Sequence, residues 1–391
     1  MTSLTLAWRY LWSRPLGALL NLLLLSLGLA SISFLLLVSS QLHQALEKDL
    51  AGIDLVVGAK GSPMQLILCG VFHLDVPPGN IALQDVQELA RNPMVAQVIP
   101  LSLGDNLQGF RIVGTTPDYA AHYGVPLAQG RAWRAPMEVL LGASVARQLG
   151  LQVGSRFAGE HGLEAGGHAH QDQAYTVVGL LQPSGTVLDR LVLTDSASVW
   201  ALHADAGAAA AREVTLALVQ YKTPLAAMQL PRWVNTQTRM QAAAPALEIT
   251  RLFTMLGLGT TVLRTMAAVL LLTAGLGVFI ALWSALRERR ADLALLRMLG
   301  APPSKIAALL LGEALWLGLL SALLGVAAGQ GLAAWLAWLL QLDNSLLIAG
   351  MAWPASLLWV PALACGVSLA AALLPAVGAY RLDVLQLLHA R

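Results

Sequence analysis

Between Leu16 and Ser40 the chain reads LGALLNLLLLSLGLASISFLLLVSS, an apolar run without a charged residue. A transmembrane helix needs about 20 mostly apolar residues to cross a hydrocarbon core about 30 Å thick. The apolar core of a secretory signal peptide has only about 7 to 15 such residues. We therefore expect this segment to remain in the protein as a membrane-spanning helix.

Three further runs meet the same length criterion, at residues 261–286, 306–340 and 354–377. Residues 306–340 are more than one crossing requires. This helix is therefore expected to tilt, to break near Gly325 or Gly329, or to project from the membrane. The order of the runs predicts an α-helical integral membrane protein with four transmembrane helices, one before and three after a large water-facing segment.

The composition agrees with a membrane protein. Of the 391 residues, 57% are hydrophobic and 12% are charged, and the mean hydropathy is +0.65. Ordinary soluble chains carry about 25% charged residues. The formal net charge of +2 provides no strong field for nucleic acid, so nucleic acid is excluded as a partner.

Basic residues in short loops predict the orientation, because Lys and Arg are retained on the cytoplasmic side. Arg9 and Arg14 precede the first run, and several arginines lie between the second and third runs. The short loop at 341–353 contains Asp343 and no basic residue. Both termini are therefore expected in the cytoplasm, with residues 43–260 on the other side.

Residues 43–260 read as a domain of mixed structure. From residue 41 to residue 260 the chain holds 17 of the 22 acidic residues, which is typical of a water-facing segment. Helix-compatible sequence at 41–50 and at 246–258 predicts stalk helices at both ends. Short β-branched runs bounded by Gly, Pro or Asp predict strands at 54–57, 95–103, 110–115, 138–141, 175–181 and 191–194. Residues 83–91 and 143–150 read as helices, so we expect an α+β fold.

The segment 287–301, between the second and third membrane runs, carries the strongest functional signal. It reads RERRADLALLRMLGA and is followed by Pro302-Pro303. This pattern predicts a short amphipathic helix with a Gly stop, suited to enter a groove on another protein. The leucine side chains would be buried in the groove, and the arginines would line the edge of the contact. The leucines are Leu293, Leu296 and Leu299, and the arginines are Arg289, Arg290 and Arg297. The alternative is a basic loop on anionic lipid.

Energy for transport must come from elsewhere. The sequence has no G-x-x-x-x-G-K-[ST] phosphate loop, no G-x-S-x-G elbow and no H-E-x-x-H pair. Glu313 and Arg264 are the few ionisable groups within the membrane runs, fewer than an ion-driven carrier is expected to need. The chain is therefore not expected to be an enzyme, and catalytic residues are not assigned.

The segment between the second and third runs resembles the permeases of the FtsX/MacB superfamily of ABC transporters, also called type VII. Residues 289–301 match the family's R-x-E-[IL]-A-L-L-R-A-L-G-A pattern, with Asp292 in the acidic position. Residues 374–376 and 380–384 resemble its P-A-x-x-A-x-R-x-x-P ending, with Val384 in place of Pro. Residues 142–154 and 175–181 look like its MacB-like periplasmic core domain.

This resemblance implies a domain order and a set of partners. Residues 1–42 would hold the cytoplasmic N-terminus and the first transmembrane helix, 43–260 the periplasmic domain, and 261–391 the FtsX-like membrane domain with its coupling helix at 287–301. The chain would form a homodimer in the bacterial inner membrane. It would bind a dimer of a separate ABC ATPase that holds ATP and Mg²⁺, and it would transmit ATP-driven motion to the periplasm.

Three functions remain open from the sequence. The permease could do mechanical work on a periplasmic or outer-leaflet substrate, release lipoproteins, or activate a periplasmic enzyme. A periplasmic adaptor or a substrate-binding protein is a further expected partner. The substrate is not identified by any residue pattern.

Three other features have both a structural and a functional interpretation. Glu313 lies about 12 Å into its membrane run at a rise of 1.5 Å per residue, so we expect it to be paired inside the helix bundle or to act directly. The Gly-rich stretch 159–172 contains His161, His168 and His170, which could bind Zn²⁺ but fit a plain flexible loop better. The apolar part of 58–81 is interpreted as a buried strand in preference to a surface for lipid or cargo.

Overall fold

The computed structural model describes residues 3–13, 15–162, 169–203, 212–289, 297–342 and 353–380, together with residues 293 and 295. The chain divides into two compact units. The membrane unit comprises residues 1–42, 256–339 and 348–391. The α+β unit comprises residues 43–255 and 340–347.

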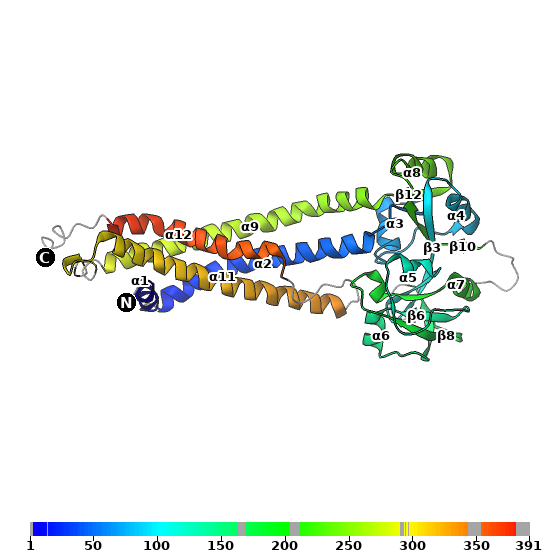
Figure 1. Ribbon diagram of the computed structural model, residues 1–391, viewed down its shortest axis with the longest axis horizontal. Helices are drawn as coiled ribbons and strands as arrows, with labels where there is room; N and C mark the ends of the chain where they lie inside the picture. Colours follow the sequence, from blue (N-terminus) through cyan, green and yellow to red (C-terminus); the bar gives the residue numbers. More distant parts are fainter. Residues whose placement is uncertain are drawn as a thin grey trace. The chain divides into compact units, whose positions relative to one another are not determined.

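Long helices make up the membrane unit, and Figure 1 shows them running side by side. The helices that contribute to it are α1 (Ser3–Leu11), α2 (Pro15–Leu50), α9 (Pro245–Glu288), α11 (Pro303–Leu342), the 3-10 turn η2 (Ala355–Leu358) and α12 (Trp359–Tyr380). Among the described residues, four stretches are long and apolar enough to cross a membrane: Pro15–Leu50, Thr261–Glu288, Pro303–Leu339 and Ala355–Tyr380. The four predicted membrane helices are confirmed.

Helix α11 is the central helix of the membrane unit. Over its apolar membrane-spanning stretch, 56% of the residues of α11 are buried. The corresponding share is 33% in α2 and 28% in each of α9 and α12. Of the three alternatives for this run, a break near Gly325 or Gly329 is excluded, because α11 is continuous from Pro303 to Leu342. Both glycines instead contact α2. A Cβ added to Gly325 would lie 2.6 Å from the Cβ of Leu29, and one on Gly329 would lie 2.6 Å from that of Ser33. The glycines therefore permit close helix packing.

The α+β unit is built on a sheet with strand order β12-β1-β11-β3-β4-β9-β6-β8-β5, to which β7 adds by pairing with β3 and β8. Its strands are β1 (Leu55–Ala59), β3 (Val95–Leu107), β4 (Phe110–Thr115), β5 (Leu127–Gly130), β6 (Glu138–Leu141), β7 (Arg156–His161), β8 (Ala169–Leu181), β9 (Val192–Asp195), β11 (Leu216–Tyr221) and β12 (Met240–Ala243). A separate pair joins β2 (Ile81–Ala82) and β10 (Glu213–Val214).

Helices cover this sheet and enclose two cores (Figure 1). They are α3 (Pro63–Gly70), α4 (Leu83–Ala90), α5 (Asp118–His122), α6 (Ala143–Leu149), α7 (Ser196–His203), α8 (Ala226–Gln237) and the 3-10 turn η1 (Val187–Arg190). One core lies among β1, β11, α4 and α8, and the other among β4, β6, β8 and α6. Strand β3 contributes Val95 to the first core and Leu107 to the second, so it joins them. The predicted α+β fold is confirmed.

The predicted buried strand within 58–81 is wrong, because residues 63–70 form helix α3. Ser62 caps this helix by accepting a hydrogen bond from the backbone N–H of Gln65 at 3.5 Å, and Pro63 occupies its first turn. A Ser cap followed by Pro is a helix-start signal, and here it decides the structure over the apolarity of the run. Leu66 and Ile67 are fully buried, so the segment belongs to the core.

The Gly-rich stretch 159–172 is not a loop throughout. Strand β7 extends to His161 and β8 begins at Ala169, and Glu160 pairs with Ala169 across the two strands. The expectation of a loop across the whole stretch is therefore wrong at both ends, because antiparallel pairing continues to satisfy the backbone there. Residues 163–168 and the side chains up to residue 172 lie outside the described part.

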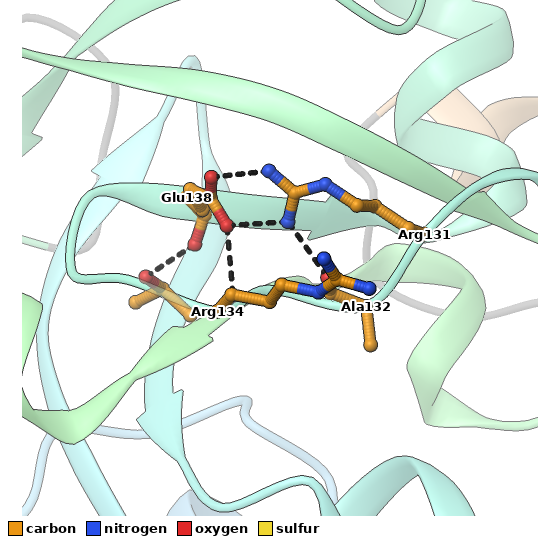
Figure 2. A network of polar contacts seen from close by, with 5 residues as sticks. Arg131, Ala132, Arg134 and Glu138 are labelled. Atoms are coloured by element: carbon orange, nitrogen blue, oxygen red, sulfur yellow. Dashed lines mark hydrogen bonds and ion pairs between the residues drawn. The ribbon is translucent and has the colours of Figure 1, made fainter.

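The connection between β5 and β6 is fastened by a bidentate ion pair. Figure 2 shows the carboxylate of Glu138 between the guanidinium of Arg131 and the backbone N–H of Arg134. Arg131 Nη1 and Arg134 N each donate to Glu138 Oε2 at 2.7 Å. The hydrogen bonds from Arg131, followed by the one from Arg134, lower the pKa of Glu138 from 4.5 to about 2.

This pair predicts a small acid-sensitive stabilisation. Because the folded-state pKa of Glu138 is lowered, the stabilisation is present above the unfolded pKa of 4.5 and is lost as the pH falls toward about 2. The difference in urea midpoint between the wild type and Glu138→Gln should therefore shrink as the pH falls through that window. The difference between the wild type and Arg131→Met should shrink in the same way. The effect is small because the pair is solvent-accessible. A difference that stays constant with pH would contradict this account.

Candidate functional site: the connection between α9 and α11

Arg289 is the centre of a polar network at the start of the α9–α11 connection, defined here as residues 289–302. Its Nη1 donates to Glu313 Oε1 at 3.1 Å. Its Nη2 donates to the carbonyl oxygen of Tyr10 at 3.1 Å and to Ser13 Oγ at 2.6 Å. The guanidinium carbon lies 4.7 Å from the centre of the Tyr10 ring, which is within cation–π range. One side chain thus joins α9, α11 and the end of α1.

Both members of the Arg289–Glu313 ion pair are largely buried. The Arg289 side chain is 13% exposed and the Glu313 side chain 4% exposed. Glu313 therefore lies inside the helix bundle and is paired, one of the two arrangements that the sequence allowed. The separation of 24 positions between the two residues hides this pairing from any sequence pattern.

The connection has a buried side and an exposed side. Leu293 is only 3% exposed and belongs to the same apolar cluster as Leu286, Ile306 and Leu310. Its backbone N–H donates to Arg289 O at 2.9 Å, as in a helical turn. The buried side therefore continues from Arg289 to Leu293, one turn further along.

The opposite side of the connection is apolar and exposed. Leu295, Met298 and Leu299 are 53%, 55% and 83% exposed. The backbone N–H of Leu299 donates to Leu295 O at 3.0 Å, so these residues follow one another on a helical turn. Large exposed apolar side chains in one group are typical of a surface that binds a partner.

The coupling residues predicted from the sequence therefore divide into four groups. Leu299 is exposed as a partner contact requires. Arg289 and Leu293 face the bundle of the chain itself, which differs from the expected rim and anchor roles, because burial inside the membrane unit satisfies both side chains. Arg297 is partly exposed, and Arg290 and Leu296 lie outside the described residues. The sequence reasoning missed Leu295 and Met298, although their spacing of i, i+3 and i+4 with Leu299 was a usable signal.

The distal end of α2 is bound within the α+β unit. Asp49 Oδ1 accepts a hydrogen bond from the backbone N–H of Val187 at 2.6 Å, and the carbonyl of Asp49 accepts one from Tyr123 Oη at 2.7 Å. Ring nitrogen Nε2 of His122 lies 2.8 Å from Ala51 O. The helix predicted to continue through residue 50 does so, and its last turn is fastened to α5 and η1.

The zinc prediction remains a prediction. His161 Nδ1 lies 3.0 Å from Asp105 Oδ1, across the paired strands β7 and β3. The side chains of His168 and His170 lie outside the described residues. Within the described part of the chain, groups of three or more His, Cys, Asp or Glu side chains that could hold a metal ion are absent.

Comparison with known proteins adds two sequence matches. Residues 18–237 match the MacB-like periplasmic core domain, and residues 264–384 match the FtsX-like permease C-terminal domain. A comparison with curated proteins finds no match. The two matches follow one another along the chain in the order of the α+β unit and the last three membrane helices.

Solved structures similar to this chain include two domains from outside the membrane. The periplasmic region of MacB from Actinobacillus actinomycetemcomitans is 12% identical, with a TM-score of 0.36, and the alignment covers 52% of this chain and 95% of that one. The extracellular domain of the noncanonic ABC-type transporter YknZ from Gram-positive bacteria is 14% identical, with a TM-score of 0.32. That alignment covers 49% of this chain and 98% of the other. The family assignment therefore rests on the two sequence matches.

A helix, an α+β domain and three further helices, with an exposed connection between the second and third spans, define a multi-pass membrane protein of the permease class. The chain belongs to the FtsX/MacB family of ABC transporter permeases.

Proposed function

We propose that this chain is the permease subunit of a type VII ABC transporter, which couples ATP hydrolysis by a separate ATPase to conformational work on a substrate in the periplasm or the outer leaflet. The observation that carries the proposal is the two-sided α9–α11 connection. Its apolar side is open to a partner, and its other side is joined to three helices through Arg289 and Leu293.

The exposed side supports an input from the ATPase. Leu295, Met298 and Leu299 would enter a groove on the ATPase, as an amphipathic helix enters a hydrophobic groove. Movement of this segment would shift Arg289 through Leu293, whose backbone N–H donates to Arg289 O at 2.9 Å. Arg289 would pass the shift to α11 through Glu313 and to α1 through Tyr10 and Ser13.

The end of α2 supports an output. A helix without a break transmits displacement along its axis, and α2 is continuous from Pro15 to Leu50. Its last turn is fastened to α5 and η1 through Asp49 and Ala51. Displacement of α2 would therefore move these two elements of the α+β unit.

The remaining partners follow from the same proposal. Both termini and the α9–α11 connection would lie in the cytoplasm, where ATP and Mg²⁺ are bound by the ATPase dimer. Two copies of this chain would form the membrane half of the complex in the bacterial inner membrane. A periplasmic adaptor or substrate-binding protein would meet the α+β unit.

A double substitution tests the input. Leu295→Glu together with Leu299→Glu should abolish co-purification of the ATPase and its turnover in lipid nanodiscs. Loss of apolar anchors worth about 2 to 4 kcal/mol corresponds to roughly 30- to 1,000-fold weaker binding. Leu296 lies outside the described residues, so the two exposed leucines are the sharper choice.

The control is Met228→Glu, which places one carboxylate where an apolar side chain is 79% exposed on α8. The control should retain the ATPase and full turnover. Wild-type binding in the double variant would contradict the input role of the connection. A wild-type complex that never contains an ATPase would overturn the proposed function itself.

The proteins that co-purify with the wild-type permease would separate the three functions that the sequence left open. An adaptor or an outer-membrane channel would favour work on an exported substrate, and a lipoprotein carrier would favour lipoprotein release. A cell-wall hydrolase would favour regulation of a periplasmic enzyme.

A further inference from the structure

Arg111 on strand β4 is a buried cation. The residue is only 6% exposed, and its Nη2 donates to the carbonyl oxygen of Asp75 at 2.8 Å. Its Nη1 is enclosed by protein and meets no hydrogen-bond acceptor among the described residues. The ion pairs within this part of the chain do not include Arg111, whereas the largely buried Arg289 is paired with Glu313. Because a guanidinium stays charged in proteins, Arg111 needs an anion that these residues do not supply.

The groups close to Arg111 do not take that role. Burial raises the pKa of the Cys69 thiol to about 12, although the charge of Arg111 opposes the shift, so the thiol stays neutral. Burial likewise raises the pKa of the Tyr119 hydroxyl. The carboxylate of Asp75 is half-buried, and its Oδ1 accepts the backbone N–H of Val76 at 2.7 Å. Arg111 Nη1 is therefore left without an anionic acceptor.

His73 presents a second buried polar atom without a partner. The residue is 6% exposed, its Nδ1 meets no partner among the described residues, and its Nε2 lies 3.0 Å from Tyr119 Oη. Burial, followed by the charges of Arg111 and Arg190, lowers the pKa of His73 from 6.5 to about 3, so the ring is neutral. If the Tyr119 hydroxyl donates to Nε2, the single ring proton lies on Nδ1, which is then a donor. His73 precedes by two residues the carbonyl that Arg111 binds.

An anion satisfies these two donors better than a water molecule does. A buried water makes about three hydrogen bonds, so it would also need acceptors for its own hydrogens. The carbonyl oxygen of Asp75 already accepts from Arg111. A negative ion accepts both N–H groups, needs no acceptor, and balances the buried guanidinium.

We propose that Arg111 Nη1 and His73 Nδ1 bind a small monovalent anion, chloride, between β4 and the connection that follows α3. Both nitrogens are enclosed by protein, which selects a single-atom ion over a carboxylate or phosphate ligand. The site lies wholly within the α+β unit. It is independent of the proposed coupling to an ATPase.

The bound anion would stabilise the attachment of α2. His73 contacts Tyr119 on α5, and the ring of Tyr119 meets that of Tyr123 edge to face with centroids 5.7 Å apart. The hydroxyl of Tyr123 donates to the carbonyl oxygen of Asp49 in the last turn of α2. An ion that holds His73 in place therefore supports the helix to which α2 is fastened.

Hydrogen exchange of the permease alone in nanodiscs tests the site. Sodium chloride is compared with sodium gluconate at equal ionic strength, because gluconate is too large for an enclosed site. Amides of residues 63–76 and 110–123 should exchange more slowly in chloride. Where exchange requires release of the ion, the rate should fall about tenfold for each tenfold rise in chloride above the Kd. Equal rates in the two salts would overturn the proposal.

Two variants separate a specific site from a general salt effect. Arg111→Met should lose the chloride dependence, and Arg134→Met, which removes an exposed guanidinium from the same unit, should keep it. The same dependence in Arg111→Met as in the wild type would overturn the proposal. Loss of the dependence in both variants would do so too, because net charge would then be its cause.

A measurement on the wild type serves if Arg111→Met does not fold. Crystals of the permease grown in bromide should show an anomalous scattering peak within hydrogen-bond distance of Arg111 Nη1 and His73 Nδ1. An oxygen-sized peak without anomalous signal at that position would identify a water molecule. That result would overturn the proposal, as would a position filled by a protein side chain.

Discussion

Replacement of Glu313 with alanine should lower the free energy of unfolding of the membrane unit by about 3 to 5 kcal/mol, the cost of leaving one partner of a buried ion pair unpaired. The unpaired charge would be the guanidinium of Arg289, whose side chain is 13% exposed. Arg289 would keep its contacts with Tyr10 and Ser13 but lose its carboxylate. Equilibrium unfolding in mixed micelles measures the change.

Two comparisons make this result specific. Arg287→Ala removes an exposed arginine from the same end of α9, where its guanidinium lies 5.9 Å from the centre of the Trp283 ring, and its effect should stay below about 1 kcal/mol. Arg289→Met combined with Glu313→Leu removes both charges, so the double variant should be more stable than Glu313→Ala. Equal effects of Glu313→Ala and Arg287→Ala would show that the pair does not hold the helices together.

Gly329→Ala and Gly331→Ala should change stability in opposite directions. A Cβ on Gly329 would meet the Cβ of Ser33 at 2.6 Å and the carbonyl oxygen of Ala30 at 3.0 Å, so α2 and α11 must separate. Overpacking of this kind typically costs about 1 to 3 kcal/mol. For Gly331, a Cβ would meet nothing within 4 Å. That variant should gain up to about 1 kcal/mol, because alanine favours a helix over glycine.

The same unfolding measurement compares the two variants, which differ only in the side of α11 that they change. Gly325→Ala should behave like Gly329→Ala, since its Cβ would lie 2.6 Å from that of Leu29. A stabilised Gly329→Ala variant would mean that α11 and α2 are not in close contact at this level. The glycine spacing would then be without a packing role.

Much of the fold was predictable because its signals are local. A run of about 20 apolar residues is sufficient for a membrane helix whatever surrounds it. Strands β4 and β6 begin and end at the predicted residues, since turn residues bound them closely. At residues 63–70 two local signals compete, because the apolar run predicts a strand whereas Ser62-Pro63 is a helix start, and the helix start decides the structure.

The candidate site was predictable only in part. The sequence located the connection between the second and third spans, and it marked Glu313 as a carboxylate that needed a partner. Helical periodicity indicated an apolar stripe, but it assigned Leu293 to the partner surface. The assignment differs from the structure because periodicity places residues on a face without saying what that face meets.

The sequence by itself determined the number and order of the membrane helices, the presence of an α+β domain between the first two, and the family. These properties depend on the length and composition of continuous segments. Only the tertiary structure decided that Arg289 pairs with Glu313, that Leu293 is buried, and that Gly325 and Gly329 bring two helices together. Each of these contacts joins segments far apart in the chain, and their energy exists only once the helices have packed.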